Sequence, residues 1–196
     1  HTLNIDINDL KNKITPNTKA IFVVHVMGNP CDMNQICDIA KTNNLIIIED
    51  CCEALGAKWD GENVGNFGLA ASYSFFFSHH ITTMEGGMIA CSSNEVADQL
   101  KILRAHGWTR NIDADKSMIE GFDIDPRYAF VNWGFNLRPT ELQAGFGLHQ
   151  IEKLPKFNEN RLRLANLFFN FLDSQPFLSR PTLDKKASPA WFALPI

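Results

Sequence analysis

Two short apolar runs on either side of one amphipathic segment limit the fold that this chain can adopt. Residues 20–26 (AIFVVHV) are rich in β-branched side chains, and residues 45–48 (LIII) contain no polar residue. Between them, Asp32 stands at an N-cap position, and apolar residues recur at helical spacing until Asn43. A strand that is apolar on both faces is typical of a parallel sheet covered by helices. The pattern therefore predicts a βαβ unit and an α/β fold.

An acidic pair, Glu49 and Asp50, follows the second predicted strand directly. In open α/β sheets, ligands bind outside the carboxyl ends of the strands. Asp50 is therefore a candidate site residue by its position. A solvated charge at a strand end would give the same pattern, so position alone leaves both interpretations open.

The rest of the chain alternates predicted strands and helices around one long irregular stretch. We expect a short helix within 4–14, strands within 69–77 and 86–93, a helix from the capping residue Asn94 to Gly107, no regular structure over 108–132, and helices over 140–154 and 159–174. Prolines after residue 174 predict a boundary, with residues 1–174 in one domain and residues 175–196 at the start of a second.

The composition argues against several classes of partner. A formal net charge of −4 gives no basic field of the kind that nucleic acid or an anionic lipid surface attracts. No apolar stretch approaches the roughly 20 residues that span a bilayer. The five cysteines form no CxxC pair, which favours reduced thiols and a cytoplasmic location. We therefore expect no nucleic-acid partner and no membrane insertion.

Several motifs occur in a fixed order: EDCCEALGA, GENVGNFG, SFFFSHHITTMEGG, AHG and GFNLRPTELQAGFG. Over nearly the whole chain they resemble the DegT/DnrJ/EryC1/StrS family of pyridoxal-phosphate sugar aminotransferases. The resemblance implies the large domain of the aspartate-aminotransferase-like (fold type I) enzymes, with a mostly parallel central sheet flanked by helices. Residues 1–174 would be part of that cofactor-binding domain, without its N-terminal part, and residues 175–196 the start of the small C-terminal domain.

The resemblance also implies roles for individual residues in binding the cofactor. Asp50 would pair with the pyridine nitrogen, because a nearby anion favours the protonated pyridinium that draws electrons. Glu53 would lie near the ring, at a position where relatives often carry Gln or His. Ser74 and Ser78 would bind the phosphate or lie beside it. Asn136 would reach the phosphate of a neighbouring subunit, which implies a homodimer with shared sites.

His79 occupies the position at which aminotransferases of this family carry the lysine that forms the Schiff base with the cofactor. Imidazole cannot form that bond, so the cofactor, as pyridoxal or pyridoxamine phosphate, would not be attached covalently. Histidine can still act as a general base near neutral pH. The substitution resembles the family's cluster-free 3-dehydratases of deoxysugar and O-antigen biosynthesis, which remove the C3 hydroxyl of a nucleotide-linked 4-keto-6-deoxyhexose. Glutamate would restore the amine form of the cofactor.

Alternatives remain beside the dehydratase interpretation. A sugar aminotransferase could use another lysine, but Lys58 and Lys101 lie outside the motif. A non-catalytic relative could keep the fold for binding sugar nucleotides. A metal site at His79 and His80 lacks an acidic or cysteine partner at ligand spacing, so we expect no metal. His80 is expected to be structural, and an iron–sulfur cluster lacks ligands because only Cys91 follows His79.

Overall fold

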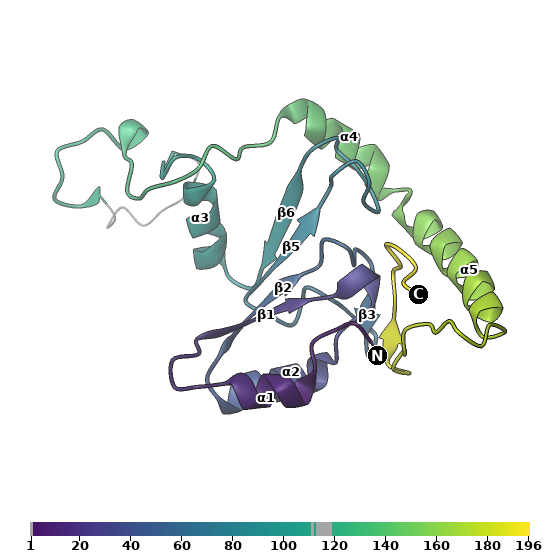
Figure 1. Ribbon diagram of the computed structural model, residues 1–196. Coiled ribbons are helices and arrows are strands. Elements are labelled where there is room, and N and C mark those ends of the chain that lie inside the picture. Colours follow the sequence, from purple (N-terminus) through teal and green to yellow (C-terminus); the bar gives the residue numbers. More distant parts are fainter. Residues whose placement is uncertain (1, 111, 113–118) are drawn as a thin grey trace. The chain divides into compact units, whose positions relative to one another are not determined.

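The computed structural model describes residues 2–110, 112 and 119–196 (Figure 1). It divides into two compact units, one formed by His1–Ala90 with Glu141–Ile196 and the other by Cys91–Thr140. Each unit is described by itself below. The predicted boundary between a large and a small domain after residue 174 concerns the full-length protein and remains a prediction.

The predicted βαβ unit is present in the first compact unit. Strand β1 (Ala20–Val24) and strand β2 (Ile46–Asp50) pair in parallel, and helix α2 (Met33–Thr42) connects them. The Asp32 carboxylate accepts a hydrogen bond from the backbone N–H of Gln35 at 3.1 Å, as expected of an N-cap. Strand β1 ends two residues earlier than predicted, because Val26 begins the short 3-10 helix η1 (Val26–Gly28).

The main sheet has the strand order β1-β2-β5-β6, which confirms the predicted α/β fold with a mostly parallel sheet. Strand β5 (Ala70–Ser74) runs parallel to β2, and strand β6 (Gly87–Cys91) lies on its other side. Both strands are shorter than the predicted ranges 69–77 and 86–93. Asp50 pairs with Ser72 across β2 and β5, so the carboxyl ends of these strands lie at the same edge of the sheet.

Helix α1 (Ile7–Lys13) and helix α2 cover one face of β1 and β2 (Figure 1). The core between them is formed by alternate strand residues and the apolar stripe of α2; its buried members include Ile21, Val23, Ile47, Met33, Ile36 and Ile39. Residues between these on the strands, such as Phe22 and Ile46, are exposed in the described chain. The alternation follows from the two-residue period of a strand.

A second, small sheet with the order β4-β3-β7 was not predicted. It consists of β3 (Lys58–Trp59), β4 (Glu62–Asn63) and β7 (Ala187–Ser188), each two residues long. Such short strands leave no periodic signal in a sequence. Strand β7, yellow in Figure 1, brings the C-terminal segment back to β3.

Helices α4 (Glu141–Ile151) and α5 (Leu154–Leu172) confirm the two predicted C-terminal helices. Helix α5 begins five residues earlier than predicted. Pro155 lies in its first turn, where a missing backbone N–H costs no hydrogen bond. The buried face of α5 packs Ala165, Phe169 and Leu172 against Trp191.

The second unit contains helix α3 (Asn94–Leu103) and the 3-10 helix η3 (Pro126–Tyr128). The N-cap of α3 is Ser93, whose hydroxyl accepts from the N–H of Val96 at 3.3 Å, so the prediction that Asn94 caps this helix is wrong. Residues 111 and 113–118 of the predicted irregular stretch lie outside the described residues.

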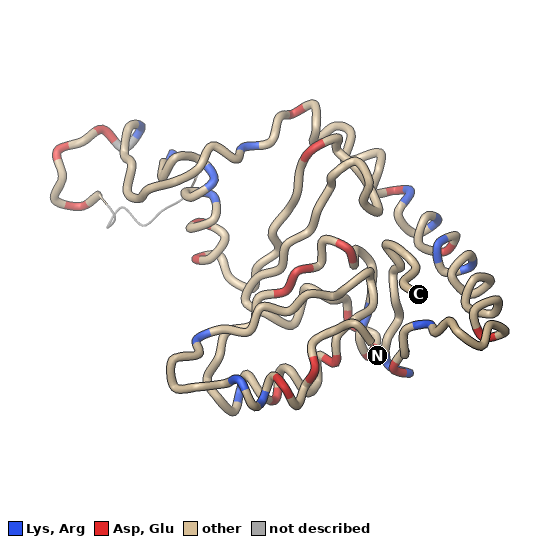
Figure 2. Tube along the Cα trace, viewed as in Figure 1, with Lys and Arg blue, Asp and Glu red and all other residues tan. Residues whose placement is uncertain are grey.

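Helices α1 and α5 each carry charged side chains of both signs (Figure 2). In the part of the chain that the structure describes, no helix combines the length and apolar character needed to cross a membrane.

Candidate active site

The acidic pair at the end of β2 divides between two sides of the strand. Glu49 is fully buried, whereas Asp50 is half-buried, because successive strand residues point to opposite faces. One Glu49 oxygen accepts from the N–H groups of Phe67 and Gly68 at 2.9 and 2.8 Å. The other accepts from the Gly65 N–H at 2.7 Å and lies 3.2 Å from His25 Nε2. Glu49 therefore ties the GNFG turn to the sheet.

His25, Glu49 and Cys51 are close enough to suggest a metal site, but their hydrogen bonds favour a different interpretation. His25 Nδ1 accepts from the N–H of Cys31 at 3.1 Å, so the neutral ring carries its proton on Nε2 and donates to Glu49. A metal on Nε2 would displace that proton. Burial alone would raise the pKa of Glu49, but bonds from His25, Gly65 and Gly68 outweigh burial and lower it. Burial raises the pKa of the Cys51 thiol.

The backbone of Cys52 joins the two main candidate residues, Asp50 and His79. Its N–H donates to Asp50 Oδ1 at 2.9 Å, and its carbonyl oxygen lies 2.7 Å from His79 Nδ1. A carboxylate at the sheet edge and an imidazole from the loop after β5 are thus held by one residue. Sequence patterns missed this link, because backbone groups carry no residue signature.

The hydrogen bond to Cys52 determines which nitrogen of His79 can act as a base. A carbonyl oxygen only accepts hydrogen bonds, so Nδ1 carries the proton and donates it. In the neutral ring the lone pair then lies on Nε2. The tautomer is thus set by a backbone partner, as it is for many catalytic histidines.

Aromatic and polar side chains surround the half-buried His79 ring. The Phe192 ring lies with its centroid 4.9 Å away, and the Phe76 ring meets it edge-on at 6.2 Å. His79 also lines a hollow of about 370 Å³, together with polar side chains that include Thr82, Gln150 and Arg161. The ring therefore stands between packed aromatic groups and an open space.

The surroundings of His80 do not suit a catalytic base. Its Nε2 donates to the carbonyl of Ala190 at 2.9 Å, and its side chain is buried. Burial lowers the pKa of His80 to about 4, so the ring is neutral at physiological pH. This environment fits the structural role that the sequence suggested.

The predicted phosphate ligands lie on the loop that carries His79. Ser74 ends β5 at the same sheet edge as Asp50, and its hydroxyl accepts from the N–H of Phe76 at 3.2 Å. Ser78 is exposed in the loop itself. Both hydroxyls can still donate to a phosphate oxygen, and their binding role remains a prediction.

Glu53 and Asn136 lie in other surroundings. The Glu53 carboxylate accepts from the N–H of Met27 at 2.9 Å, which ties it to the turn after β1. Asn136 belongs to the second unit, where it is exposed and forms an isolated bridge with Ala105. The predicted contacts of Glu53 with the cofactor ring and of Asn136 with a neighbouring subunit's phosphate remain predictions.

The donor set at the edge of β2 and β5 fits pyridoxal phosphate chemically. Asp50 offers a carboxylate for a pyridinium, and Ser74 offers a hydroxyl for a phosphate. His79 offers an unprotonated nitrogen, held in one orientation. The anion matches the pyridinium, and the neutral donor matches a phosphate oxygen.

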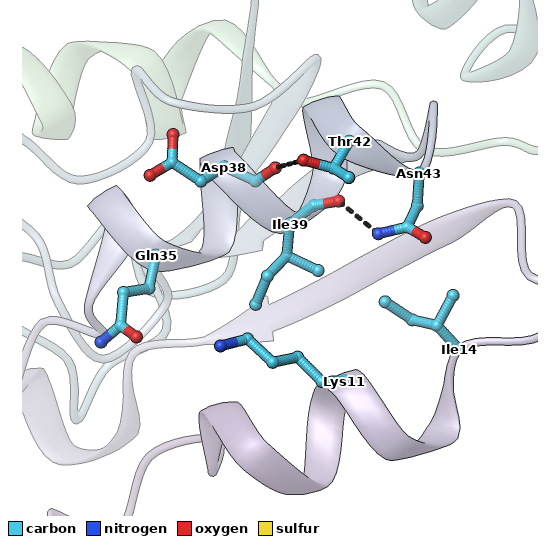
Figure 3. A pocket seen from close by; sticks show the side chains of 7 residues that line it. All are labelled: Lys11, Ile14, Gln35, Asp38, Ile39, Thr42 and Asn43. Atoms are coloured by element: carbon cyan, nitrogen blue, oxygen red, sulfur yellow. Dashed lines mark hydrogen bonds between the residues drawn. The ribbon is translucent and has the colours of Figure 1, made fainter.

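A larger hollow of about 510 Å³ lies between α1 and α2, away from these strand ends (Figure 3). Two of its polar side chains are already bonded to the helix that carries them. Thr42 donates to the carbonyl of Asp38, and Asn43 donates to that of Ile39. The hollow is a groove between two surface helices, and none of the candidate residues named above lines it.

Comparisons with known proteins identify the family of the chain. The family model described as "DegT/DnrJ/EryC1/StrS aminotransferase family" matches residues 1–196. The chain is 42% identical, over 90% of its length and 46% of the relative's, to a GDP-4-keto-6-deoxy-D-mannose 3-dehydratase of Yersinia pseudotuberculosis. It is 38% identical, over 85% of its length and 41% of the relative's, to a GDP-perosamine synthase of Caulobacter vibrioides. The chain spans about half the length of the curated relatives it matches.

Solved structures give the same result. An Escherichia coli GDP-4-keto-6-deoxy-D-mannose 3-dehydratase with bound hydrated PLP matches with a TM-score of 0.89 and 37% identity, over 98% of this chain and 50% of that one. A structure of GDP-4-keto-6-deoxymannose 3-dehydratase with a trapped PLP–glutamate geminal diamine matches with a TM-score of 0.88 and 36% identity, over 98% and 50% of the two chains. The chain therefore belongs to the DegT/DnrJ/EryC1/StrS aminotransferase family.

Proposed function

We propose that the protein uses pyridoxal or pyridoxamine phosphate to remove the C3 hydroxyl of a nucleotide-linked 4-keto-6-deoxyhexose. The family resemblance assigns His79 to the Schiff-base position, and the observation that supports the proposal is that its Nδ1–H is held by the Cys52 carbonyl at 2.7 Å. This arrangement leaves Nε2 as the basic atom. A base of this kind contributes about 10²–10⁴-fold to a proton transfer.

The residues of the site have different roles in this reaction. The bound cofactor supplies the amine and an electron-withdrawing ring. Asp50 holds the pyridinium, and Ser74 and Ser78 bind the phosphate. His79 Nε2 accepts a proton from the reacting centre and can return it to the departing hydroxyl. Because imidazole cannot bond covalently to the cofactor, Asp50, Glu53 and the serines must hold it by noncovalent contacts.

The proposed partners follow from the same chemistry and from the relatives. A GDP-linked sugar is the preferred substrate, because relatives named for GDP sugars match over most of the chain. Glutamate is the proposed amino donor, in agreement with the PLP–glutamate adduct in a related dehydratase. We also propose a homodimer, to which Asn136 of a second copy would contribute. The free thiols of all five cysteines support a reducing compartment such as the cytoplasm.

The stoichiometry of the products tests the proposal. Full-length protein would be supplied with pyridoxamine phosphate, glutamate and GDP-4-keto-6-deoxymannose. Loss of the C3 hydroxyl is a two-electron reduction of the sugar, which oxidation of glutamate balances. We therefore expect one 2-oxoglutarate and one ammonia for each 3-deoxy sugar, as measured by mass spectrometry, NMR and enzymatic ammonia assay. An amino sugar formed without free ammonia would refute the dehydratase function.

Two variants separate the dehydratase from its alternatives. His79→Asn removes the base and should abolish turnover while binding of the nucleotide sugar persists; full turnover would show that His79 is not the base. Borohydride reduction followed by intact mass should leave the wild-type protein without attached cofactor. His79→Lys should become labelled, which provides the positive control for that measurement.

The two lysines weighed for the aminotransferase alternative, Lys58 and Lys101, have other surroundings. Lys58 is exposed on β3, in the small sheet. Lys101 belongs to the second unit and pairs with Asp98 at 2.7 Å. The similarity to GDP-perosamine synthases keeps this alternative open to the product test above.

A further inference from the structure

A short C-terminal segment, residues 190–192, lies beside the candidate base although more than 100 positions separate them in the sequence. The segment is held on one side by the turn after β1. Ala190 N–H donates to the Gly28 carbonyl, and Phe192 N–H donates to the Met27 carbonyl, both at 3.0 Å. The close approach requires glycine, because a Cβ on Gly28 would lie 1.8 Å from the Ala190 oxygen.

Two side chains hold the same segment from the other side. His80 Nε2 donates to the Ala190 carbonyl at 2.9 Å. Arg161 Nη1, on helix α5, donates to the carbonyls of Trp191 and Phe192 at 3.1 and 2.9 Å. Five hydrogen bonds therefore fix the segment to the turn after β1, to the loop that carries His79 and His80, and to α5.

These hydrogen bonds fix the position of the Phe192 ring beside His79. Its centroid lies 4.9 Å from that of His79, with 40° between the planes, which is ordinary contact geometry for two aromatic rings. The hydrogen bond from Nδ1 holds one edge of the imidazole, and the tilted Phe192 ring packs beside it. Together they limit both the position of the ring and its rotation.

We propose that Phe192 is a positioning residue that holds the His79 imidazole with Nε2 directed at the reacting centre. The inference rests on the proposed function of His79 as the base. A base that is free to rotate spends less time in the reactive orientation, and a displacement of about 1 Å can cost about 10²-fold in rate. Substrate affinity does not depend on that orientation, so the effect belongs in kcat.

Three substitutions of Phe192 test the proposal with the full-length protein. Phe192→Ala should lower kcat about 10–100-fold and change KM for the nucleotide sugar less than about threefold. Phe192→Leu keeps bulk without a ring and should fall between Ala and wild type. Phe192→Tyr keeps the ring and should stay within about threefold of wild type. Phe177→Ala, at a position 95% exposed, is the matched control and should leave kcat unchanged.

A spectroscopic measurement reads His79 without turnover. Two-bond ¹⁵N–¹H spectra distinguish the tautomers of a histidine ring. The neutral ring of His79 should show the Nδ1–H tautomer in wild type, and Phe192→Ala and Phe192→Leu should show exchange between the two tautomers. The Tyr variant should restore the wild-type pattern.

Specific outcomes overturn the inference. An Ala or Leu variant with wild-type kcat and a wild-type His79 spectrum would show that the contact does not position the base. A fall in kcat that disappears after correction for the folded fraction, measured by circular dichroism, would show a purely structural role. If wild type makes no 3-deoxy sugar, the proposed function fails, while the spectra still decide whether Phe192 holds the ring.

Discussion

Replacing Glu49 by Gln should destabilise the protein far more than its conservative size suggests. The Glu49 carboxylate is fully buried and accepts four hydrogen bonds, from Gly65, Phe67, Gly68 and His25. Glutamine keeps the shape but has only one acceptor oxygen. Its amide group would face two donors that can no longer be satisfied.

The cost follows from the number of donors left without an acceptor. An unsatisfied buried donor costs about 1–3 kcal/mol, so two of them cost about 2–6 kcal/mol. The lost bonds had a charged acceptor, which favours the upper half of that range. Against a total stability of about 5–15 kcal/mol, Glu49→Gln should remove about half of the free energy of unfolding.

Urea unfolding at pH 7, with Glu152→Gln on the exposed surface as the matched control, measures this cost. The control should stay within about 0.5 kcal/mol of wild type. The folded pKa of Glu49 lies below its unfolded value, so its contribution is present above the unfolded pKa of about 4.3 and is lost as pH falls through the folded pKa. The gap between wild type and Glu49→Gln should therefore narrow below about pH 4. A gap under 1 kcal/mol at pH 7 would contradict the reasoning.

Three further predictions follow from single residues. Gly65→Ala should lower the melting temperature by several degrees, because Gly65 has a φ of 96° and a Cβ would lie 1.9 Å from the Tyr73 hydroxyl. Gly61→Ala is the control, because Gly61 also has a positive φ but a Cβ there would meet open space. Burial lowers the pKa of His80 to about 4, so the unfolded chain binds the extra proton between about pH 6.5 and 4, and stability should fall as pH falls through that window. His80→Gln, whose amide nitrogen can take the place of the Nε2 donor to Ala190, should flatten the loss between urea titrations at pH 7 and pH 5. Burial and a hydrogen bond to Asp50 raise the pKa of the Cys52 thiol to about 11. Iodoacetamide at pH 8 should therefore label Cys52 at least about tenfold more slowly than a free cysteine, as followed by peptide mass spectrometry. Labelling at the rate of a free cysteine would contradict the raised pKa.

The parts of the fold that the sequence predicted are those in which local pattern and tertiary packing agree. The apolar stripe of α2 and the runs of β1 and β2 are buried in the structure, so period and environment coincide. The two-residue strands of the small sheet carry no period. Their pairing depends on contacts between residues 58–59 and 187–188, which no local window can detect.

In the candidate site, too, the sequence predicted side chains but not the backbone groups that contact them. Residue types and the family resemblance predicted Asp50, Ser74 and His79, because their chemistry lies in the side chain. The strand period could also have assigned Glu49 to the buried face, since Glu49 shares that face with Ile47. The Cys52 carbonyl, which sets the tautomer of His79, was beyond prediction because every residue has a carbonyl.

Under the proposed function, a histidine in place of the Schiff-base lysine explains why the site needs contacts that orient the His79 ring. A lysine that bonds to the cofactor is positioned by that bond, so its own surroundings can be loose. A histidine has no such bond, and its two nitrogens are interchangeable until hydrogen bonds distinguish them. Position and tautomer must then come from the protein. The Cys52 carbonyl lies 2.7 Å from His79 Nδ1, and the Phe192 ring centroid lies 4.9 Å from that of His79. Under the proposed function these two contacts would orient the base, a task that a covalent bond performs for a lysine.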